Sequence, residues 1–168
     1  MADDVDRPVR KLGDSTTQRE AEAIILVEAS SQLDLPRLTP RTIVVGEGVS
    51  VTVDGAADGI VVEVYARQGK LKSAQLKKVA QDILKFRLLR EVGAVQGQML
   101  LIFASDEARA SVRGWVLLAA RTAGIELVVV DVGDEWRARL LDAQARQVMS
   151  SPLAVGDVAD DSADLSTD

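Results

Sequence analysis

Apolar and polar residues alternate along two neighbouring segments, 49–54 and 60–66, and this alternation predicts two strands joined by the turn GAADG. Successive side chains of a strand point to opposite faces of a sheet, and a buried face fixes the register of a hairpin. Burying both apolar rows together places residues 49, 51 and 53 on the same face as residues 60, 62 and 64. Asp54 and Glu63 are therefore expected to share the opposite face, whatever the length of the turn.

Apolar periodicity also predicts the remaining elements of the fold. Helices are predicted over 16–31, 71–91, 105–123 and 134–149, and further strands over 41–47, 98–104 and 125–132. The order αβββαβ followed by αβα predicts an α/β fold, with a mixed five-stranded sheet between helices on both faces. This single domain, 15–149, is expected between a disordered N-terminal tail, 1–14, and a disordered acidic C-terminal tail, 150–168.

The chain has neither histidine nor cysteine, which excludes several classes of chemistry. Cysteine and serine–histidine nucleophiles, thiolate or imidazole metal sites and structural disulfides are all ruled out. A bound metal would be a hard cation on oxygen ligands, and a general base would be a carboxylate, a lysine or a metal-bound water. No G-x-G-x-x-G or P-loop sequence follows a predicted strand, so no nucleotide cradle is indicated. No apolar run approaches the ~20 residues of a membrane span and no signal peptide opens the chain, so a cytoplasmic protein is expected.

The net charge of −6 is unevenly distributed along the chain. The tail, 150–168, holds five aspartates and no basic residue, whereas 15–149 has 17 acidic and 17 basic residues. Within this neutral domain, 67–90 holds eight basic residues against Asp82 alone, a net charge of +7. A concentrated basic helix fits a polyanionic partner, and an ordinary solvated helix face is the alternative explanation.

The order αβββαβ, with Asp54 at the end of the second strand and Glu63 inside the third, resembles the restriction-endonuclease-like, or PD-(D/E)XK, nuclease superfamily. The resemblance covers 16–104 and includes the basic helix, whose segment begins GKLKSAQLKKV. It implies a nuclease in which Asp54 and Glu63 hold Mg²⁺ or Mn²⁺, the metal activates water and a lysine neutralises the scissile phosphate. The superfamily's motif has that lysine two residues after the Glu, where this chain has Tyr65, and some members carry it on the following helix instead.

The helix predicted over 71–91 offers candidates for the missing lysine. At ~100° per residue, the apolar face of this helix consists of Leu76, Val79, Ala80, Ile83 and Leu84. A polar stripe beside that face consists of Gln75, Lys78, Asp82 and Lys85. Gln75 and Lys78 are nearest the hairpin, so we expect Lys78 to be the relocated cation and Gln75 to bind water or phosphate. Lys70 and Lys72, in the loop before the helix, are rival cations. The alternative is an ordinary amphipathic helix whose Gln75 and Asp82 satisfy local hydrogen bonds.

Other residues have simpler interpretations. Glu20, Glu22 and Glu28 of the first helix are candidates for a third carboxylate, as the first helix supplies one in some relatives, although exposed helical Glu is the simpler interpretation. Trp115 and Trp136 stand at helical spacing among apolar residues and are expected in core or dimer contacts rather than in base stacking.

Three functions fit these residues. The first is a metal-dependent nuclease whose partner is nucleic acid, DNA in the first place, bound by Lys70, Lys72, Lys77, Lys78 and Lys85. The second is a catalytically inactive module of the same fold that binds nucleic acid or a protein partner, and Tyr65 at the lysine position favours it. The third is an interaction protein whose basic helix docks its own acidic tail or an acidic partner. A homodimer is compatible with the first function, because many enzymes of the superfamily pair to address two strands.

Overall fold

A computed structural model describes residues 12–150 as five strands and five helices. The strands are β1 (Thr39–Gly46), β2 (Val49–Ala57), β3 (Ile60–Tyr65), β4 (Gln98–Phe103) and β5 (Glu126–Val129). The helices are α1 (Leu12–Gln32), α2 (Ser73–Glu91), α3 (Asp106–Ala110), α4 (Gly114–Thr122) and α5 (Gly133–Ser150). Of the predicted tails, 1–11 and 151–168 lie outside the described residues, and 12–14 belong to α1.

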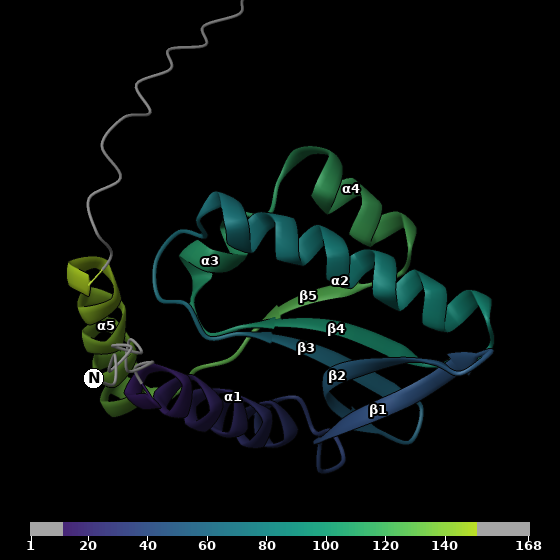
Figure 1. Cartoon of the computed structure of the whole chain (residues 1–168), viewed down its shortest axis with the longest axis horizontal. Coiled ribbons are helices and arrows are strands. Elements are labelled where there is room, and N and C mark those ends of the chain that lie inside the picture. The colour runs from purple at the N-terminus through teal and green to yellow at the C-terminus, as the bar shows by residue number, and fades with distance from the viewer. Residues whose placement is uncertain (1–11, 151–168) are drawn as a thin grey trace, which may run out of the picture.

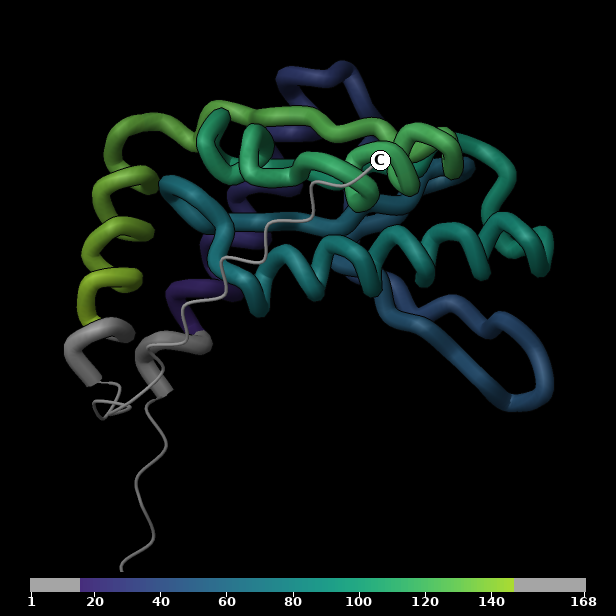
Figure 2. Tube along the Cα trace, turned by 90° about the horizontal axis from the view of Figure 1, so that it is seen from above, coloured from purple at the N-terminus to yellow at the C-terminus, as the bar shows by residue number. Residues whose placement is uncertain are grey.

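The strands form one mixed sheet in the order β1-β2-β3-β4-β5. The β1–β2 and β2–β3 pairs are antiparallel and joined by tight turns, whereas β3, β4 and β5 are parallel and joined by crossovers through helices. Helices α2 and α4 cover one face of the sheet and α1 covers the other, while the β1–β2 hairpin extends beyond the body (Figures 1 and 2). The predicted α/β fold with a mixed five-stranded sheet flanked by helices is confirmed.

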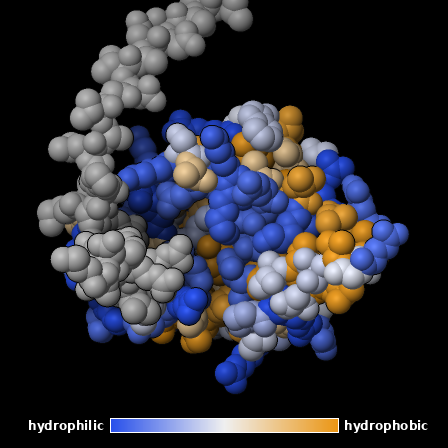
Figure 3. Space-filling view, in the orientation of Figure 1, coloured by the Kyte–Doolittle hydropathy of each residue, from blue (hydrophilic) through white to orange (hydrophobic). Residues whose placement is uncertain are grey.

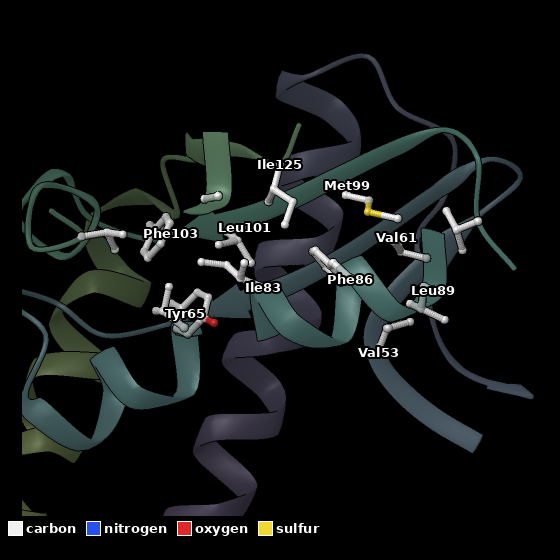
Figure 4. Packing of buried hydrophobic residues seen from close by; sticks show 14 of the residues in the cluster. Val53, Val61, Tyr65, Ile83, Phe86, Leu89, Met99, Leu101, Phe103 and Ile125 are labelled. Carbon is white, nitrogen blue, oxygen red and sulfur yellow. The ribbon is translucent and has the colours of Figure 1, made fainter. Parts of the chain in front are cut away.

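Two apolar cores lie on the two faces of this sheet. The first core, between the sheet and α2 and α4, is filled by large side chains such as Phe86, Leu101 and Phe103 (Figure 4). The second core, between the sheet and α1 and α5, includes Ile25 and Ile102. Strands β3 and β4 are buried on both faces, and β4 accordingly reads in the sequence as an almost continuous apolar run.

A β-bulge in β2 sets the direction of the following residues. Across the β1–β2 pair, Arg41 faces Val53 and Thr39 faces Ala56, so that Pro40 alone stands opposite residues 54 and 55. Proline has no N–H to donate to the ladder and is tolerated on edge strands and at bulges, and β1 is an edge strand. A bulge adds one residue to one strand and so reverses the facing of everything beyond it.

The predicted hairpin register is wrong because of this bulge. Val51 and Val53 face the first core, on the side of α2, whereas Val62 and Val64 face the second core, on the side of α1. The regular pairing runs only from Ala57 opposite Ile60 to Gly55 opposite Val62. The alternation of each strand was correctly identified, but the two apolar rows face opposite sides of the sheet.

The helix predicted over 105–123 is two helices, α3 and α4. Ser105 caps α3 as expected, with its side chain accepting a hydrogen bond from the Ala108 N–H. The buried Val112 anchors the turn that follows in the first core, and Gly114 takes a φ of +56° where α4 begins. Burial of Val112 and the left-handed glycine together separate the two helices. None of the helices within 12–150 combines the length and apolar character that a membrane span requires.

The predicted apolar face of α2 is partly wrong. Its buried residues are Val79, Asp82, Ile83, Phe86 and Leu89, whereas Leu84 is 68% exposed. The helix is rotated so that Phe86 and Leu89 enter the first core and Asp82 meets charged partners described below. The large apolar area of these two side chains outweighs that of Leu84.

Replacing Phe86 and Leu84 tests this rotation. Phe86→Ala should lower the free energy of unfolding by about 3–5 kcal/mol, because the fully buried ring leaves a cavity. Leu84→Ala, a control two residues away on the same helix, should change it by less than about 0.5 kcal/mol. Urea denaturation followed by circular dichroism measures both values. Equal losses in the two variants would contradict the orientation of α2.

Candidate active site

A pocket of about 200 Å³, here named the carboxylate pocket, opens at the carboxyl end of β3. Its polar lining includes Glu22 of α1, Asp54 of β2, and Gln75 and Lys78 of α2. The surface over the N-terminal half of α2 is mainly hydrophilic, whereas apolar residues gather over its C-terminal half (Figure 3). In open α/β sheets, ligands bind outside the carboxyl ends of the parallel strands, which is where this pocket lies.

The bulge aims Asp54 at this pocket. Directly beyond the last regular pair of β2 and β3, the Val64 N–H donates a hydrogen bond to Asp54 Oδ2 at 2.9 Å. Gly55 follows, and a Cβ at that position would lie 2.6 Å from Leu26 Cδ2 of α1. The absence of this Cβ therefore lets α1 approach the sheet closely. Glu22, one turn before Leu26, is thereby brought to the same pocket as Asp54.

Glu63 lies deeper, in a buried ion-pair network formed by Glu63, Tyr65, Lys78, Asp82 and Lys85. Its side chain is 1% exposed, with Lys85 Nζ 2.6 Å from Oε1 and Lys78 Nζ 3.5 Å from Oε2. Asp82 lies 2.8 Å from Lys78 Nζ and 3.0 Å from Lys85 Nζ, and accepts a hydrogen bond from the Tyr65 hydroxyl at 2.6 Å. Lys78 Nζ also lies 4.9 Å from the centre of the Tyr65 ring. Lys78 is therefore held between the network and the carboxylate pocket.

The network shifts the pKa values of its members. Burial, together with the negative charges of Asp54 and Asp82, raises the pKa of Glu63 to about 8 despite the hydrogen bond from Lys85. Burial lowers the pKa of Lys78, but the hydrogen bond to Asp82 and the surrounding carboxylates outweigh it, so the pKa lies above its ordinary value. Burial and the charge of Asp82 raise the pKa of Tyr65, so its hydroxyl remains a donor. At the pocket, burial and the charge of Asp54 raise the pKa of Glu22, although a hydrogen bond from Gln18 opposes this.

The structure brings Asp54, Gln75 and Lys78, three of the predicted site residues, into one pocket. Glu63 lies behind Lys78 rather than in the lining of the pocket. Gln75 Oε1 accepts a hydrogen bond from the backbone N–H of Lys72 and so also caps the start of α2.

The five lysines predicted to bind nucleic acid divide into two groups. Lys78 and Lys85 belong to the ion-pair network and are largely neutralised there. Lys70, Lys72 and Lys77 are exposed, and none of them forms an ion pair with a carboxylate in the described part of the chain. The exposed cationic surface of this segment therefore lies at the start of α2.

No protein family matches this chain, and no significant similarity links it to a curated protein or to a solved structure.

The candidate third carboxylates differ in their surroundings. Glu22 lines the carboxylate pocket, whereas Glu20 pairs with Arg139 of α5 at 3.0 Å and Glu28 accepts a hydrogen bond from Gln32. Within the described residues, no group of three or more acidic side chains is arranged as a ready-made metal cage.

The sequence indicated the roles of several residues of the site only in part. Asp82 was predicted to lie in the polar stripe of the helix and to satisfy local hydrogen bonds, but its contacts with Tyr65 and with both lysines were not indicated. Tyr65 was noticed as a departure from the superfamily's motif. The role of α5 was not indicated at all. Gln144 accepts a hydrogen bond from the Gln68 N–H at 2.8 Å and donates one to the Gln68 carbonyl at 3.2 Å, which holds α5 against the pocket.

The two tryptophans have different environments. Trp136 is half-buried, packs on the second core and lies 4.0 Å beneath the guanidinium of Arg139. Trp115 is 72% exposed, so the expected core position is wrong for this residue, and the expected dimer contact stays a prediction. Helix α4 packs through Ala120 and the preceding Val112, which leaves Trp115 on its outer side.

The raised pKa of Glu63 predicts a pH-dependent stability. The folded protein keeps a proton on Glu63 up to about pH 8, whereas the unfolded chain releases it near 4.5, so stability should fall as pH rises between these values. The loss should reach up to about 1.4 kcal/mol per pH unit. Glu63→Gln removes this titration.

Urea denaturation from pH 4.5 to pH 9 measures the free energy of unfolding of Glu63→Gln and of wild type, and the difference between the two tests the prediction. The variant should gain stability relative to wild type as pH rises to about 8, and the difference should then level off. A difference that stays constant over the whole range would mean that Glu63 is ionised throughout as a simple ion pair with Lys85.

Proposed function

We propose that this protein is a Mg²⁺-dependent nuclease that hydrolyses phosphodiester bonds at the carboxylate pocket. The observation that carries the proposal is the meeting of Glu22, Asp54 and Lys78 in one pocket at the carboxyl end of β3. Metal-dependent hydrolysis of phosphodiesters uses carboxylates that hold a divalent cation and a positive side chain that faces the phosphate. The pocket beside the β2–β3 turn and the two along α2, at Trp115 and at Leu84, lack this combination.

The charge balance of the site fits a divalent cation. The carboxylates of the pocket and the ion-pair network are Glu22, Asp54, Glu63 and Asp82. Against them stand Lys78, Lys85 and Arg67, which balance the site while Glu63 keeps its proton. A bound cation would favour ionisation of Glu63 and would balance the negative charge that this ionisation adds. Repulsion from a neighbouring carboxylate contributes to the raised pKa of Glu22 and of Glu63, and a cation would relieve it.

Asp54 and Glu22, the two carboxylates that line the pocket, would hold the metal. Glu63, predicted from the sequence as the second ligand, lies behind Lys78 and outside the lining. Proteins commonly bind Mg²⁺ through one or two carboxylates and leave several waters on the ion, so a cage of three acidic side chains is not required. When bound, Mg²⁺ supplies an acidified water and polarises a phosphoryl oxygen.

Lys78 would neutralise charge on the scissile phosphate. Its raised pKa keeps it protonated at neutral pH, and Asp82 together with the Tyr65 ring holds its ammonium group beside the pocket. Gln75, whose Oε1 already accepts from Lys72 N–H, would offer its NH₂ group to a phosphate oxygen. Such preorganised donors stabilise the charge that develops in phosphoryl transfer.

The fold supports assignment to the restriction-endonuclease-like group. From α1 to β4 the elements follow the order αβββαβ, with Asp54 at the bulge of the second strand and Glu63 within the third. Tyr65 occupies the position of the motif's lysine, and the ammonium group of Lys78 lies over its ring. A lysine supplied by α2 thus stands beside the position where the motif would have one.

Asp54→Asn tests the proposal. Cleavage of DNA in Mg²⁺ or Mn²⁺ should fall by about 100-fold or more, because a direct metal ligand should matter more than the outer-shell groups whose loss costs about 10–100-fold. Asp58→Asn, an exposed change on the same hairpin and outside the pocket, should cleave like wild type. Calorimetric titration with Mg²⁺ should show weaker binding for Asp54→Asn alone.

A catalytically inactive nucleic-acid-binding module is the second candidate. It is favoured by Glu63, whose 1% exposed carboxylate is already paired with Lys85 at 2.6 Å. Salt-sensitive binding of nucleic acid, without metal binding or cleavage in either metal, would select this function and reject the nuclease.

Both functions predict binding through the exposed lysines at the start of α2. Combined replacement of Lys70, Lys72 and Lys77 by Gln should lower the slope of log affinity against log salt by up to about 2–3, since each neutralised phosphate releases condensed counterion. Arg146→Gln is the control, because Arg146 pairs with Asp142 on α5. Fluorescence anisotropy with a labelled oligonucleotide measures the slope. An unchanged slope in the triple variant would place the nucleic acid elsewhere on the protein.

A further inference from the structure

A second groove lies on the other flank of α2, between α2 and α4, and encloses about 550 Å³. Its apolar lining comes from Leu76, Ala80, Trp115 and Val116. We call it the Trp115 groove. The Trp115 indole is 72% exposed and, together with the apolar lining of the groove, forms a contiguous apolar surface. Contiguous exposed apolar surfaces commonly mark binding sites.

Positive charge accompanies the exposed ring. Lys77 and Arg113 line the Trp115 groove and are both exposed, and no carboxylate is among the described residues that line it. The ligand should therefore present a flat apolar surface and a negative charge together. A second copy of this chain fits poorly, because a two-fold interface places the same patch on both sides and so brings the same cations together.

We propose that the Trp115 groove binds an unpaired nucleotide of single-stranded nucleic acid. The base stacks on the Trp115 indole, and the adjoining phosphates lie at Lys77 and Arg113. Bases of a duplex are stacked on each other and do not offer their faces, whereas single strands bind to exposed aromatic rings in positively charged grooves. Tyr65, the single tyrosine of the chain, is buried and cannot serve, and Trp136 is occupied by Arg139.

The inference rests on the proposed function and specifies its substrate as nucleic acid with an unpaired strand. Lys77 lines the Trp115 groove and Lys78, the next residue, lines the carboxylate pocket. Successive helical residues point about 100° apart, so the two lysines face the two flanks of the same helix. A strand anchored on Trp115 would cross the start of α2, past Lys77, to reach the pocket.

Tryptophan fluorescence tests the stacking directly. The chain has two tryptophans, so in Trp136→Phe all indole emission comes from Trp115. Titration of this protein with oligothymidylate in EDTA at low salt should quench the emission, whereas a duplex of equal length should quench little. In the protein that keeps Trp136, Trp115→Ala should weaken oligothymidylate binding about 5- to 150-fold, and Trp115→Phe should retain most of the affinity. Leu118→Ala, which removes another exposed apolar side chain of α4, should bind like wild type.

The outcomes separate this inference from the nuclease proposal. Oligothymidylate binding without quenching, and with Trp115→Ala at wild-type affinity, would overturn the stacking site and leave the nuclease intact. Quenching with no metal-dependent cleavage would support the stacking site and reject the nuclease. No binding of either nucleic acid would defeat both. Two results without nucleic acid would also overturn the inference. Trp115 emission that changes with protein concentration would identify a second copy of the chain as the occupant of the groove. Trp115 emission that changes when 151–168 are deleted would identify the acidic tail as the occupant.

Discussion

The ion-pair network between β3 and α2 is the interaction on which the arrangement of the rest depends. Burying an ionised carboxylate without a partner would cost several kcal/mol. Asp82 is paired with both lysines, and the burial of Glu63 is relieved by its raised pKa and by the hydrogen bond from Lys85. Lys78 and Lys85, two helical turns apart, lie on one side of α2 and pair with both carboxylates. No buried side-chain nitrogen or oxygen in the described part of the chain lacks a partner. Pairing these charges, together with the burial of Phe86 and Leu89, sets the rotation of α2.

The bulge opposite Pro40 is the second constraint, because it decides which layers meet at the pocket. Without the extra residue, Asp54 would lie in a regular ladder opposite Glu63, with both side chains toward α2. With it, the Asp54 carboxylate accepts from the Val64 N–H and reaches a pocket shared by α1, α2 and α5. Gly55 completes the arrangement, because its missing side chain admits α1 close to the sheet. Three elements distant in sequence therefore supply one site.

Helix α2 separates two surfaces with different chemistry. Its basic composition suggested a uniformly cationic element, but pairing removes much of that charge. Lys85 and Lys78 meet buried carboxylates, Arg87 pairs with Glu91, and Arg90 donates to the Ala123 carbonyl. The charge that remains exposed is concentrated at the start of the helix, between the carboxylate pocket and the Trp115 groove. This concentration gives a polyanion a defined path across the protein rather than a broad patch.

The sequence by itself determined the α/β class, the five strands and the position of most helices, because apolar periodicity reflects local geometry and burial. It also indicated that Asp54, Gln75 and Lys78 could meet, since only the β2–β3 turn, β3 and a short loop separate Asp54 from the start of α2. The facing of β2, the split between α3 and α4, and the exposure of Leu84 and Trp115 were decided only by the tertiary structure. Each depends on a contact distant in sequence: Pro40 across the sheet, Val112 in the first core, and the charges of β3 beneath α2. Periodicity shows which side chains of a segment are apolar. The neighbour that each face of the segment contacts is determined by the packing of segments that are distant in sequence.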